Sequence, residues 1–274
     1  MRLATIRHDG ATRAVRVETD EVVLLEGADV GAILRSAAGA AAAEGARIAL
    51  SEIEFAPVVT HPDKIVCVGV NYRDHIEEMG RDVPGAPTYF AKYRAALIGA
   101  GDDICLPPTD VSTHTDWEAE LAIIIGTPVR HASPTEAYDA IAGFTVLNDV
   151  SVRDWQRRTT QFLAGKSFEG MTPVGPVLVT KDEVGDGSGL AITTEIDGVV
   201  KQSSNTSELV FNAVDIVADL SKIITLEPGD IIATGTPGGV GAARTPPEWM
   251  ADGTVLRTSI EGLGECVNTC RLPT

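Results

Sequence analysis

Two glutamates stand at the start of a strongly apolar segment, and their spacing suggests a metal site. Glu118 and Glu120 lead directly into residues 121–125, Leu-Ala-Ile-Ile-Ile. If this is one strand, the two side chains share a face and their carboxylates lie about 7 Å apart. Like charges beside an apolar strand are costly unless a cation lies between them, and divalent cations prefer such oxygen ligands. A solvated edge of a sheet is the alternative explanation.

A third carboxylate, Asp149, ends the apolar segment 143–149 and can join the same site. Three carboxylates, with water completing the coordination shell, suit Mg²⁺ or Mn²⁺ better than Zn²⁺, because no His or Cys contributes. An aspartate in this position is also typical of a turn. The pattern therefore predicts a site for a hard divalent cation, with an ordinary turn as the alternative.

The segment 151–166 reverses the charge of the chain. The whole sequence has 22 Lys and Arg against 39 Asp and Glu, a net charge of −17. This segment has one acid and a group of basic residues: Arg153, Arg157, Arg158 and Lys166. If residues 152–161 are helical, Arg153, Gln156 and Arg157 share a face. That face can bind a substrate carboxylate through guanidinium hydrogen bonds, or it can be a solvated basic surface.

His75 and Glu78 have the residue types and spacing of an oriented general base. Three residues apart, they lie on one face of a helix and can hydrogen-bond, although a surface ion pair has the same spacing. The chain contains neither His-Glu-x-x-His nor Gly-x-Ser-x-Gly, so neither a zinc protease nor a serine hydrolase is indicated. Thr236 lies in the glycine-rich segment 234–241, whose amides and hydroxyl can face an anion.

The excess of acidic residues disfavours nucleic acids and anionic membranes as partners, because both repel a chain with a net charge of −17. The cysteines form no Cys-x-x-Cys pair and are expected to be reduced thiols: Cys67, Cys105, Cys266 and Cys270. Residues 1–10 do not resemble a signal peptide, and no apolar run approaches the ~18 residues needed to span a bilayer. We therefore expect a cytoplasmic protein.

Short apolar runs separated by Gly, Pro, Asp and Asn predict a mainly β protein of the α+β class. The runs lie at 65–70, 121–125, 144–150, 177–180, 191–196, 223–226, 231–234 and 255–260. Helices are predicted at 30–46, 72–79, 135–142, 152–161 and 207–220, the last with a cap at Asn205. Prolines 57 and 62 suggest a joint between a small N-terminal domain, residues 1–60, and a larger domain, residues 61–274.

Taken together, these motifs resemble the fumarylacetoacetate hydrolase family over roughly residues 60–270. The matching stretches follow the order of the family: Asn-Tyr-Arg-Asp-His (71–75), Phe-Ala-Lys (90–92), Asp-Trp-Glu-Ala-Glu-Leu (116–121), Asn-Asp-Val-Ser-Val-Arg-Asp-Trp-Gln (148–156), Gly-Lys-Ser-Phe (165–168) and Thr-Gly-Thr-Pro (234–237). The resemblance implies a mixed β-sandwich roll, to which the N-terminal residues would add a small α+β unit. It also implies a homodimer that binds Mg²⁺, Mn²⁺ or Ca²⁺.

The resemblance also implies a role for each candidate residue. The metal ligands would be Glu118, Glu120 and Asp149. His75 and Glu78 would activate a water molecule, and Lys166 would stabilise developing negative charge. The substrate contacts would be Lys92, Arg153, Gln156 and Thr236.

The implied substrate is a small anionic keto acid, and the implied activity is hydrolysis of a C–C bond in a 1,3-diketo acid of the acylpyruvate, fumarylpyruvate or fumarylacetoacetate type. In that reaction the departing carbanion is stabilised as an enolate. The same enolate chemistry serves two alternatives, decarboxylation of oxaloacetate and isomerisation or tautomerisation of a 2-hydroxydienoate. A non-catalytic dicarboxylate-binding protein is the alternative of another class. It would be marked by loss of a metal ligand, the lysine or the His–Glu pair, and the sequence has lost none of them.

Overall fold

Strands dominate the architecture, with 39% of residues in strands and 19% in helices. The computed structural model describes residues 1–36, 44–78, 80 and 82–273. Its mixed sheets confirm the prediction of a mainly β, α+β protein. No helix among these residues has the length and apolar character needed to cross a membrane.

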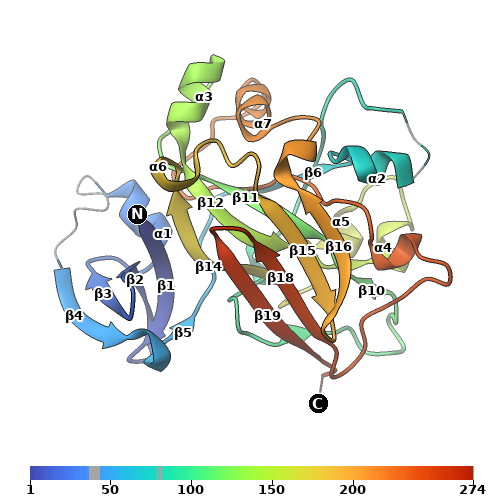
Figure 1. Ribbon diagram of the computed structural model, residues 1–274, viewed down its shortest axis with the longest axis horizontal. Helices are drawn as coiled ribbons and strands as arrows, with labels where there is room; N and C mark the ends of the chain where they lie inside the picture. The colour runs from blue at the N-terminus through green and yellow to red at the C-terminus, as the bar shows by residue number, and fades with distance from the viewer. Residues whose placement is uncertain (37–43, 79, 81, 274) are drawn as a thin grey trace.

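Twelve strands form one long mixed sheet (Figure 1). In sheet order, its main path is β4 (Glu44–Ala49), β3 (Glu21–Leu25), β2 (Ala11–Val17), β1 (Arg2–His8), β14 (Thr172–Thr180), β12 (Ile141–Asn148), β11 (Ala119–Ile125), β17 (Ile231–Ala233), β6 (Ile65–Gly69) and β7 (Thr88–Ala91). Off this path, β5 (Glu54–Phe55) pairs with β1, and β8 (Leu97–Ile98) pairs with β14.

A second, five-stranded sheet packs across the long one and forms the front layer in Figure 1. Its order is β16 (Val199–Asn205), β15 (Ala191–Ile196), β18 (Val255–Ile260), β19 (Gly264–Arg271) and β9 (Ile104–Cys105). A two-stranded ribbon pairs β10 (Thr115–Asp116) with β13 (Ser151–Val152). Apolar residues of both large sheets share one core cluster, so the sheets are held together mainly by burial of these side chains.

Strand β11 is buried on both faces, and its side chains alternate between two core clusters. Leu121, Ile123 and Ile125 join the cluster between the sheets, whereas Ala122 and Ile124 join the cluster on the opposite face. This alternation follows from the two-residue period of a strand. It explains why the sequence of β11 is a continuous apolar run, and it sets the face on which Glu120 lies, the face of Ala122 and Ile124.

The helices are short and lie around the sheets. They are α1 (Val30–Arg35), α2 (Arg73–Glu78), α3 (Pro134–Ala140), α4 (Arg153–Gln156), α5 (Leu163–Lys166), α6 (Lys181–Val184) and α7 (Ala213–Leu220). The helix predicted over 30–46 is wrong in its last part, because 44–49 form β4, which gains backbone hydrogen bonds from β3. Residues 37–43 of that prediction lie outside the described residues.

Two other predicted helices are shorter than expected. α4 ends at Gln156, and beyond it the Thr159 hydroxyl bonds to the backbone of Gln161, a local contact that competes with helix. α7 begins after Asn212, which forms a capping box with Asp215. The predicted cap, Asn205, instead caps the 3₁₀ turn Thr206–Glu208.

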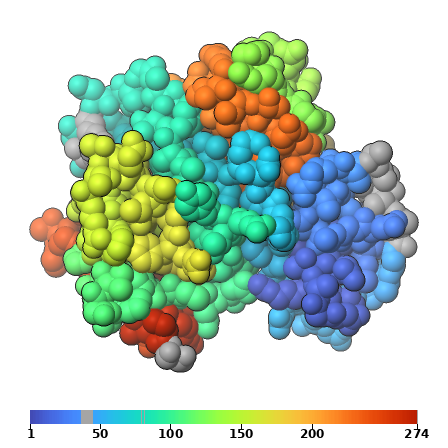
Figure 2. Space-filling model, turned by 180° about the vertical axis from the view of Figure 1, so that it is seen from behind, coloured from blue at the N-terminus to red at the C-terminus, as the bar shows by residue number. Residues whose placement is uncertain are grey.

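The N-terminal strands lie to one side of the molecule, away from the segment near residue 160 (Figure 2). They extend the long sheet, because β1 pairs with β14. The buried carboxylate of Asp29 caps α1 and accepts hydrogen bonds from the amide and hydroxyl of Thr60, which ties this part of the chain to the predicted joint. The division into domains 1–60 and 61–274 stays a prediction.

Candidate functional site

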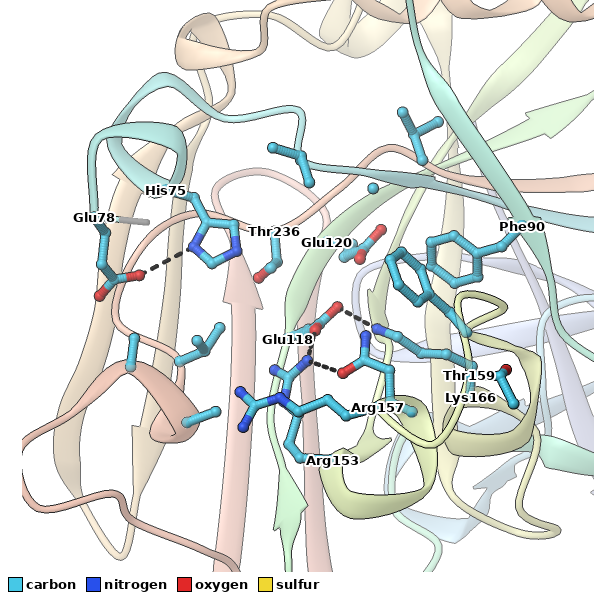
Figure 3. Close-up of a pocket in the computed structure, with 18 residues that line it drawn as sticks. His75, Glu78, Phe90, Glu118, Glu120, Arg153, Arg157, Thr159, Lys166 and Thr236 are labelled. Atoms are coloured by element: carbon cyan, nitrogen blue, oxygen red, sulfur yellow. Dashed lines mark hydrogen bonds and ion pairs between the residues drawn. The ribbon is translucent and has the colours of Figure 1, made fainter. Parts of the chain in front are cut away.

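A cavity of about 620 Å³ opens where β6, β11 and the segment after β17 come together, and it contains most of the predicted site residues (Figure 3). The lining includes Glu120 of β11 and Glu118 directly before that strand, the His75–Glu78 pair from α2, and residues of α4 and α5. The predicted residues in the lining are His75, Glu78, Glu118, Glu120, Arg153, Gln156, Lys166 and Thr236. Asp149 and Lys92 lie behind it, both fully buried.

The structure brings the three predicted metal ligands together. One oxygen of each of Glu118, Glu120 and Asp149 lies within 4.8 Å of the others, and all three residues are buried. The antiparallel pairing of β11 and β12 causes this, because Ala119 faces Asn148 and the flanking acids are therefore neighbours. The Asp149 amide donates to the Glu118 carbonyl at 2.8 Å, and the Glu118 amide donates to the Asn148 side-chain oxygen at 2.9 Å.

Three buried cations surround this group of carboxylates. Lys166 Nζ lies 2.7 Å from Glu118 Oε2 and 2.8 Å from Asp149 Oδ2, and Lys92 Nζ lies 2.6 Å from Asp149 Oδ1. Arg153 Nη1 lies 2.6 Å from Glu118 Oε1. Burial raises the pKa of Glu118, but the charges of Lys166 and Arg153 outweigh burial and hold that pKa at about 2. Glu118 is therefore ionised at neutral pH.

Glu120 differs from its two neighbours, because no cation lies within ion-pair distance of its carboxylate in the described part of the chain. Among the described residues, its hydrogen-bond partner is the Gly235 amide, at 2.7 Å from Oε2. Burial, together with the charges of Asp149 and Glu118, raises the pKa of Glu120 well above its usual range. The site therefore has a carboxylate oxygen without a countercharge beside two other buried carboxylates. This donor set fits a hard divalent cation.

The His75–Glu78 pair has the geometry of an oriented base. His75 Nδ1 lies 3.0 Å from Glu78 Oε2, and Figure 3 shows the other ring nitrogen on the side of Thr236. A histidine that donates through Nδ1 to a carboxylate keeps Nε2 as a proton acceptor. His75 lines the cavity, and only 12% of its side chain is exposed. This nitrogen can therefore act on a molecule held in the cavity.

The backbone amides of residues 235–242, which overlap the glycine-rich segment 234–241, contact the acids on several sides of the cavity. Gly235 donates to Glu120, Gly238 to Asp74, Gly239 to Glu78, and Gly241 to Asp116. The glycines are required by space as well as by backbone conformation. A Cβ on Gly241 would lie 2.1 Å from the Glu248 carbonyl oxygen, and Gly235 has a φ of +104°.

The four predicted substrate contacts differ in whether their polar atoms are already hydrogen-bonded to other residues. The Lys92 ammonium is bound to Asp149, and the described lining does not include it, so its substrate contact stays a prediction. The Thr236 hydroxyl accepts from Gln202 Nε2 at 2.8 Å and retains a hydrogen to donate. Gln156 accepts from Arg153. The Nη2 atom of Arg153 is buried without a partner in the described residues and is available as a donor.

Two residues that organise the site received no role from the sequence. Asp116 accepts from Arg153 and from the amides of Gly241 and Ala242, and its position in the motif 116–121 was the one available signal. Gln202 accepts from the Ala119 amide and the Thr194 hydroxyl while it donates to Thr236. No local pattern marks Gln202, because Ala119 and Thr236 are distant from it in the chain and only Thr194, in the paired strand β15, is near.

Comparison with known proteins agrees with the motif pattern. The model of the family "Fumarylacetoacetate (FAA) hydrolase C-terminal" matches residues 64–271. The chain is 46% identical over 220 residues to the human protein named "Oxaloacetate tautomerase FAHD2A, mitochondrial", and the match covers 80% of this chain and 69% of that protein.

Solved structures with similar folds have several different names. The "Fumarylacetoacetate hydrolase (EaFAH)" of Exiguobacterium antarcticum matches with a TM-score of 0.89 and 33% identity. The 5-carboxymethyl-2-hydroxymuconate delta-isomerase of Mycobacterium smegmatis matches with a TM-score of 0.83 and 32% identity. Both matches cover 100% of both chains. The similar proteins thus include a tautomerase, a hydrolase and an isomerase by name.

Proposed function

Because this chain belongs to the fumarylacetoacetate hydrolase family, we propose that it is a metal-dependent tautomerase that interconverts the keto and enol forms of oxaloacetate. The 46% identity to the human oxaloacetate tautomerase supports this activity. The comparisons favour the tautomerase and isomerase alternatives over the C–C hydrolase that we expected from the sequence. The observation that carries the proposal is the His75–Glu78 pair facing a buried carboxylate–lysine cluster across one cavity.

Tautomerisation needs fewer groups than hydrolysis. In the keto-to-enol direction, C3 of oxaloacetate loses a proton and the C2 oxygen gains one, while every carbon–carbon bond remains and no water is consumed. The protein has to supply a base near C3 and stabilise negative charge on the C2 oxygen. A divalent cation held by Glu118, Glu120 and Asp149 would supply Lewis-acid stabilisation of that charge.

Two different residues, His75 and Lys166, would act as the base and as the donor that stabilises the negative charge. The Nε2 atom of His75, with Nδ1 bonded to Glu78, is the base that takes the proton from C3. Lys166 is unsuited to this role. Burial lowers its pKa, but the carboxylates of Asp149 and Glu118 outweigh burial and raise the pKa above its ordinary value. Lys166 therefore keeps its proton and stabilises the enolate as a hydrogen-bond donor.

Isomerisation of a 2-hydroxydienoate is the second candidate, and the match to the delta-isomerase favours it. It needs the same kind of step, a proton moved between carbon and the oxygen at C2. Its substrates are longer, and the cavity of about 620 Å³ has room for them. The two candidates are therefore separated by substrate rather than by catalytic groups.

The direct test follows the ultraviolet absorbance of the enol after oxaloacetate is added to chelator-treated protein, with and without Mg²⁺ or Mn²⁺. We expect metal-dependent relaxation of the keto–enol equilibrium without formation of pyruvate. Pyruvate and CO₂ would instead indicate decarboxylation. Acid release from acetylpyruvate with no effect on oxaloacetate would overturn the tautomerase and support the hydrolase. A 2-hydroxydienoate in the same assay tests the second candidate.

A matched pair of histidine variants identifies the base. His75→Ala should slow the reaction by about 10² to 10⁴-fold, the usual contribution of a general base. His61→Ala changes an exposed histidine away from the cavity and should leave the rate unchanged. Equal rates in the two variants would exclude His75 as the base.

The oligomeric state and the class of substrate expected from the sequence are also proposals. We propose that the protein is a homodimer that acts on a small anionic keto acid, and light scattering tests its oligomeric state. The cytoplasmic location predicted from the sequence has no support in the comparisons, since the name of the human relative places that protein in mitochondria.

A further inference from the structure

We propose that Arg157 forms a second anion subsite in the cavity, which binds the distal carboxylate of a dicarboxylate substrate. The inference deepens the proposed function and rests on it for the identity of the substrate. Arg157 lines the cavity at the end of α4, and Figure 3 shows it with Arg153 on the same side of the cavity. It received no role in the proposed reaction.

Arg157 is a cation without a countercharge in a site where the other cations are paired. Within the described residues, Lys166 and Arg153 each bind carboxylates, and Lys92 binds Asp149. The guanidinium of Arg157 has no hydrogen-bond or ion-pair partner among those same residues. Arg157 is exposed at the edge of the cavity, and in a chain with 39 acids against 22 bases its unpaired charge is open to an anionic ligand.

The neighbouring arginine shows that this arrangement is particular to Arg157. The guanidinium carbon of Arg158 lies 3.5 Å from the centroid of the Trp155 ring, and Arg158 is not part of the described lining. Arg158 is thus used in a cation–π contact, whereas Arg157 faces the cavity. This makes Arg158 the natural control for experiments on Arg157.

The position of Arg157 fits the length of a four-carbon dicarboxylate. The Arg157 amide donates to the Arg153 carbonyl at 3.1 Å, so the two residues are one helical turn apart, about 5.4 Å along the axis. Arg153 is bonded to Glu118 and therefore lies at the carboxylate cluster, where the keto-acid end of the substrate would bind. Arg157 thus extends the basic side of the cavity beyond Arg153 by about one helical turn, a step of the same order as the length of a small dicarboxylate.

An apolar part of the cavity lining would not accept the distal carboxylate. It is formed by apolar residues, among them Val68, Phe90 and Phe162, and the two aromatic rings pack edge to face at 5.6 Å between centroids. A carboxylate against these apolar side chains would lose hydration without gaining a hydrogen bond from them. The cavity thus directs a charged end towards Arg157 and an apolar end towards Phe90 and Phe162.

A pair of ligands that differ only in the second carboxylate tests the subsite by binding rather than turnover. Calorimetric titrations in Mg²⁺ buffer would compare malate with 2-hydroxybutanoate, which has a methyl group in place of the distal carboxylate. We expect the native protein to bind malate at least tenfold more tightly. Arg157→Gln should weaken malate binding about ten- to hundredfold, the range of a charged hydrogen bond, and leave 2-hydroxybutanoate unchanged. Arg157→Lys should retain part of the preference.

The controls separate this inference from the proposed function. Arg158→Gln should keep the full preference for malate. Loss of the preference in Arg157→Gln alone supports the subsite even if the protein does not tautomerise oxaloacetate. The subsite is overturned if the native protein shows no preference, if Arg157→Gln retains it, or if that variant loses both ligands equally while its circular dichroism spectrum is native.

Discussion

Asp116 Oδ2 accepts a hydrogen bond from Arg153 Nε at 2.7 Å, and both side chains are buried. The same carboxylate accepts from the amides of Gly241 and Ala242. Asp116 therefore connects the arginine at the start of α4 to the glycine-rich segment that carries Thr236. It acts on the cavity through other residues, because it is not itself part of the lining.

The first prediction concerns this connection. Asp116→Ala should lower the free energy of unfolding by about 3–5 kcal/mol, because it leaves the buried guanidinium of Arg153 without one of its two carboxylates. Asp116→Asn keeps acceptor atoms and should cost less. Urea denaturation of the three proteins measures the difference. An Asp116→Ala variant as stable as the native chain would show that Arg153 is satisfied without this contact.

The second prediction concerns Glu120 and the divalent cation. Glu120→Gln should weaken Mg²⁺ binding at least tenfold in calorimetric titration, because it removes a charged oxygen from the group of three carboxylates. The same change should not lower the free energy of unfolding of chelator-treated protein, since Glu120 forms no ion pair with a cation among the described residues. Glu52→Gln, an exposed change, should alter neither quantity. Unaltered Mg²⁺ binding in Glu120→Gln would exclude this ligand.

The third prediction is a pH dependence at Asp29. Burial raises the pKa of this carboxyl, but hydrogen bonds from Thr60 and Ala32 outweigh burial and lower the pKa below its ordinary value of 3.8. The ionised form therefore stabilises the fold above that value, and the stabilisation is lost as the pH falls through the lower native pKa.

Asp29→Asn should accordingly cost about 1 kcal/mol at pH 7, and the difference from the native protein should shrink in acid, below about pH 4. Urea unfolding at several pH values measures both effects. The exposed Asp110→Asn variant should follow the native curve throughout. A difference for Asp29→Asn that grows on acidification would contradict the assignment.

The fourth prediction concerns the thiols. Cys105 is exposed, whereas Cys67, Cys266 and Cys270 are buried. Burial, with the charge of Asp197 next, raises the pKa of Cys270 to about 12, and burial raises the pKa of the other two buried thiols as well. A disulfide reagent should therefore modify one thiol in the native protein at pH 8 and four in urea. Cys105→Ser should remove the native reaction, and a second reactive thiol in the native protein would argue against this burial pattern.

The sequence was most informative where local pattern and chemistry coincide. The apolar run 121–125 predicted a buried strand, and the acids before it predicted a shared face. The structure brings those acids together with Asp149 because β11 and β12 pair antiparallel, which places the start of β11 beside the end of β12. Roles that depend on contacts between residues far apart in the sequence could not be predicted. Gln202 lies in the second sheet, and nothing near it in the chain indicates that it will hold Thr236.

Helix lengths were predicted less well, for a physical reason. The Ala-rich segment after Val30 has high intrinsic helix propensity, yet residues 44–49 form an edge strand, because β3 offers them backbone partners. The helix after Val152 stops after one turn, which shortens the basic face but retains the spacing of Arg153 and Arg157. In both cases tertiary contacts decided the boundary.

The amides of residues 235–242 hold four acids from three different elements, β10, β11 and α2, and this has a consequence for how the cavity can diversify. Main-chain hydrogen bonds do not depend on which side chain a residue carries, so the cavity-lining positions Thr236, Val240 and Ala242 can change their chemistry without moving the acids. Inserting or deleting one residue would displace all of these amides at once. The segment therefore separates the choice of substrate, which side chains can alter singly, from the placement of the charged groups, which the path of the backbone sets.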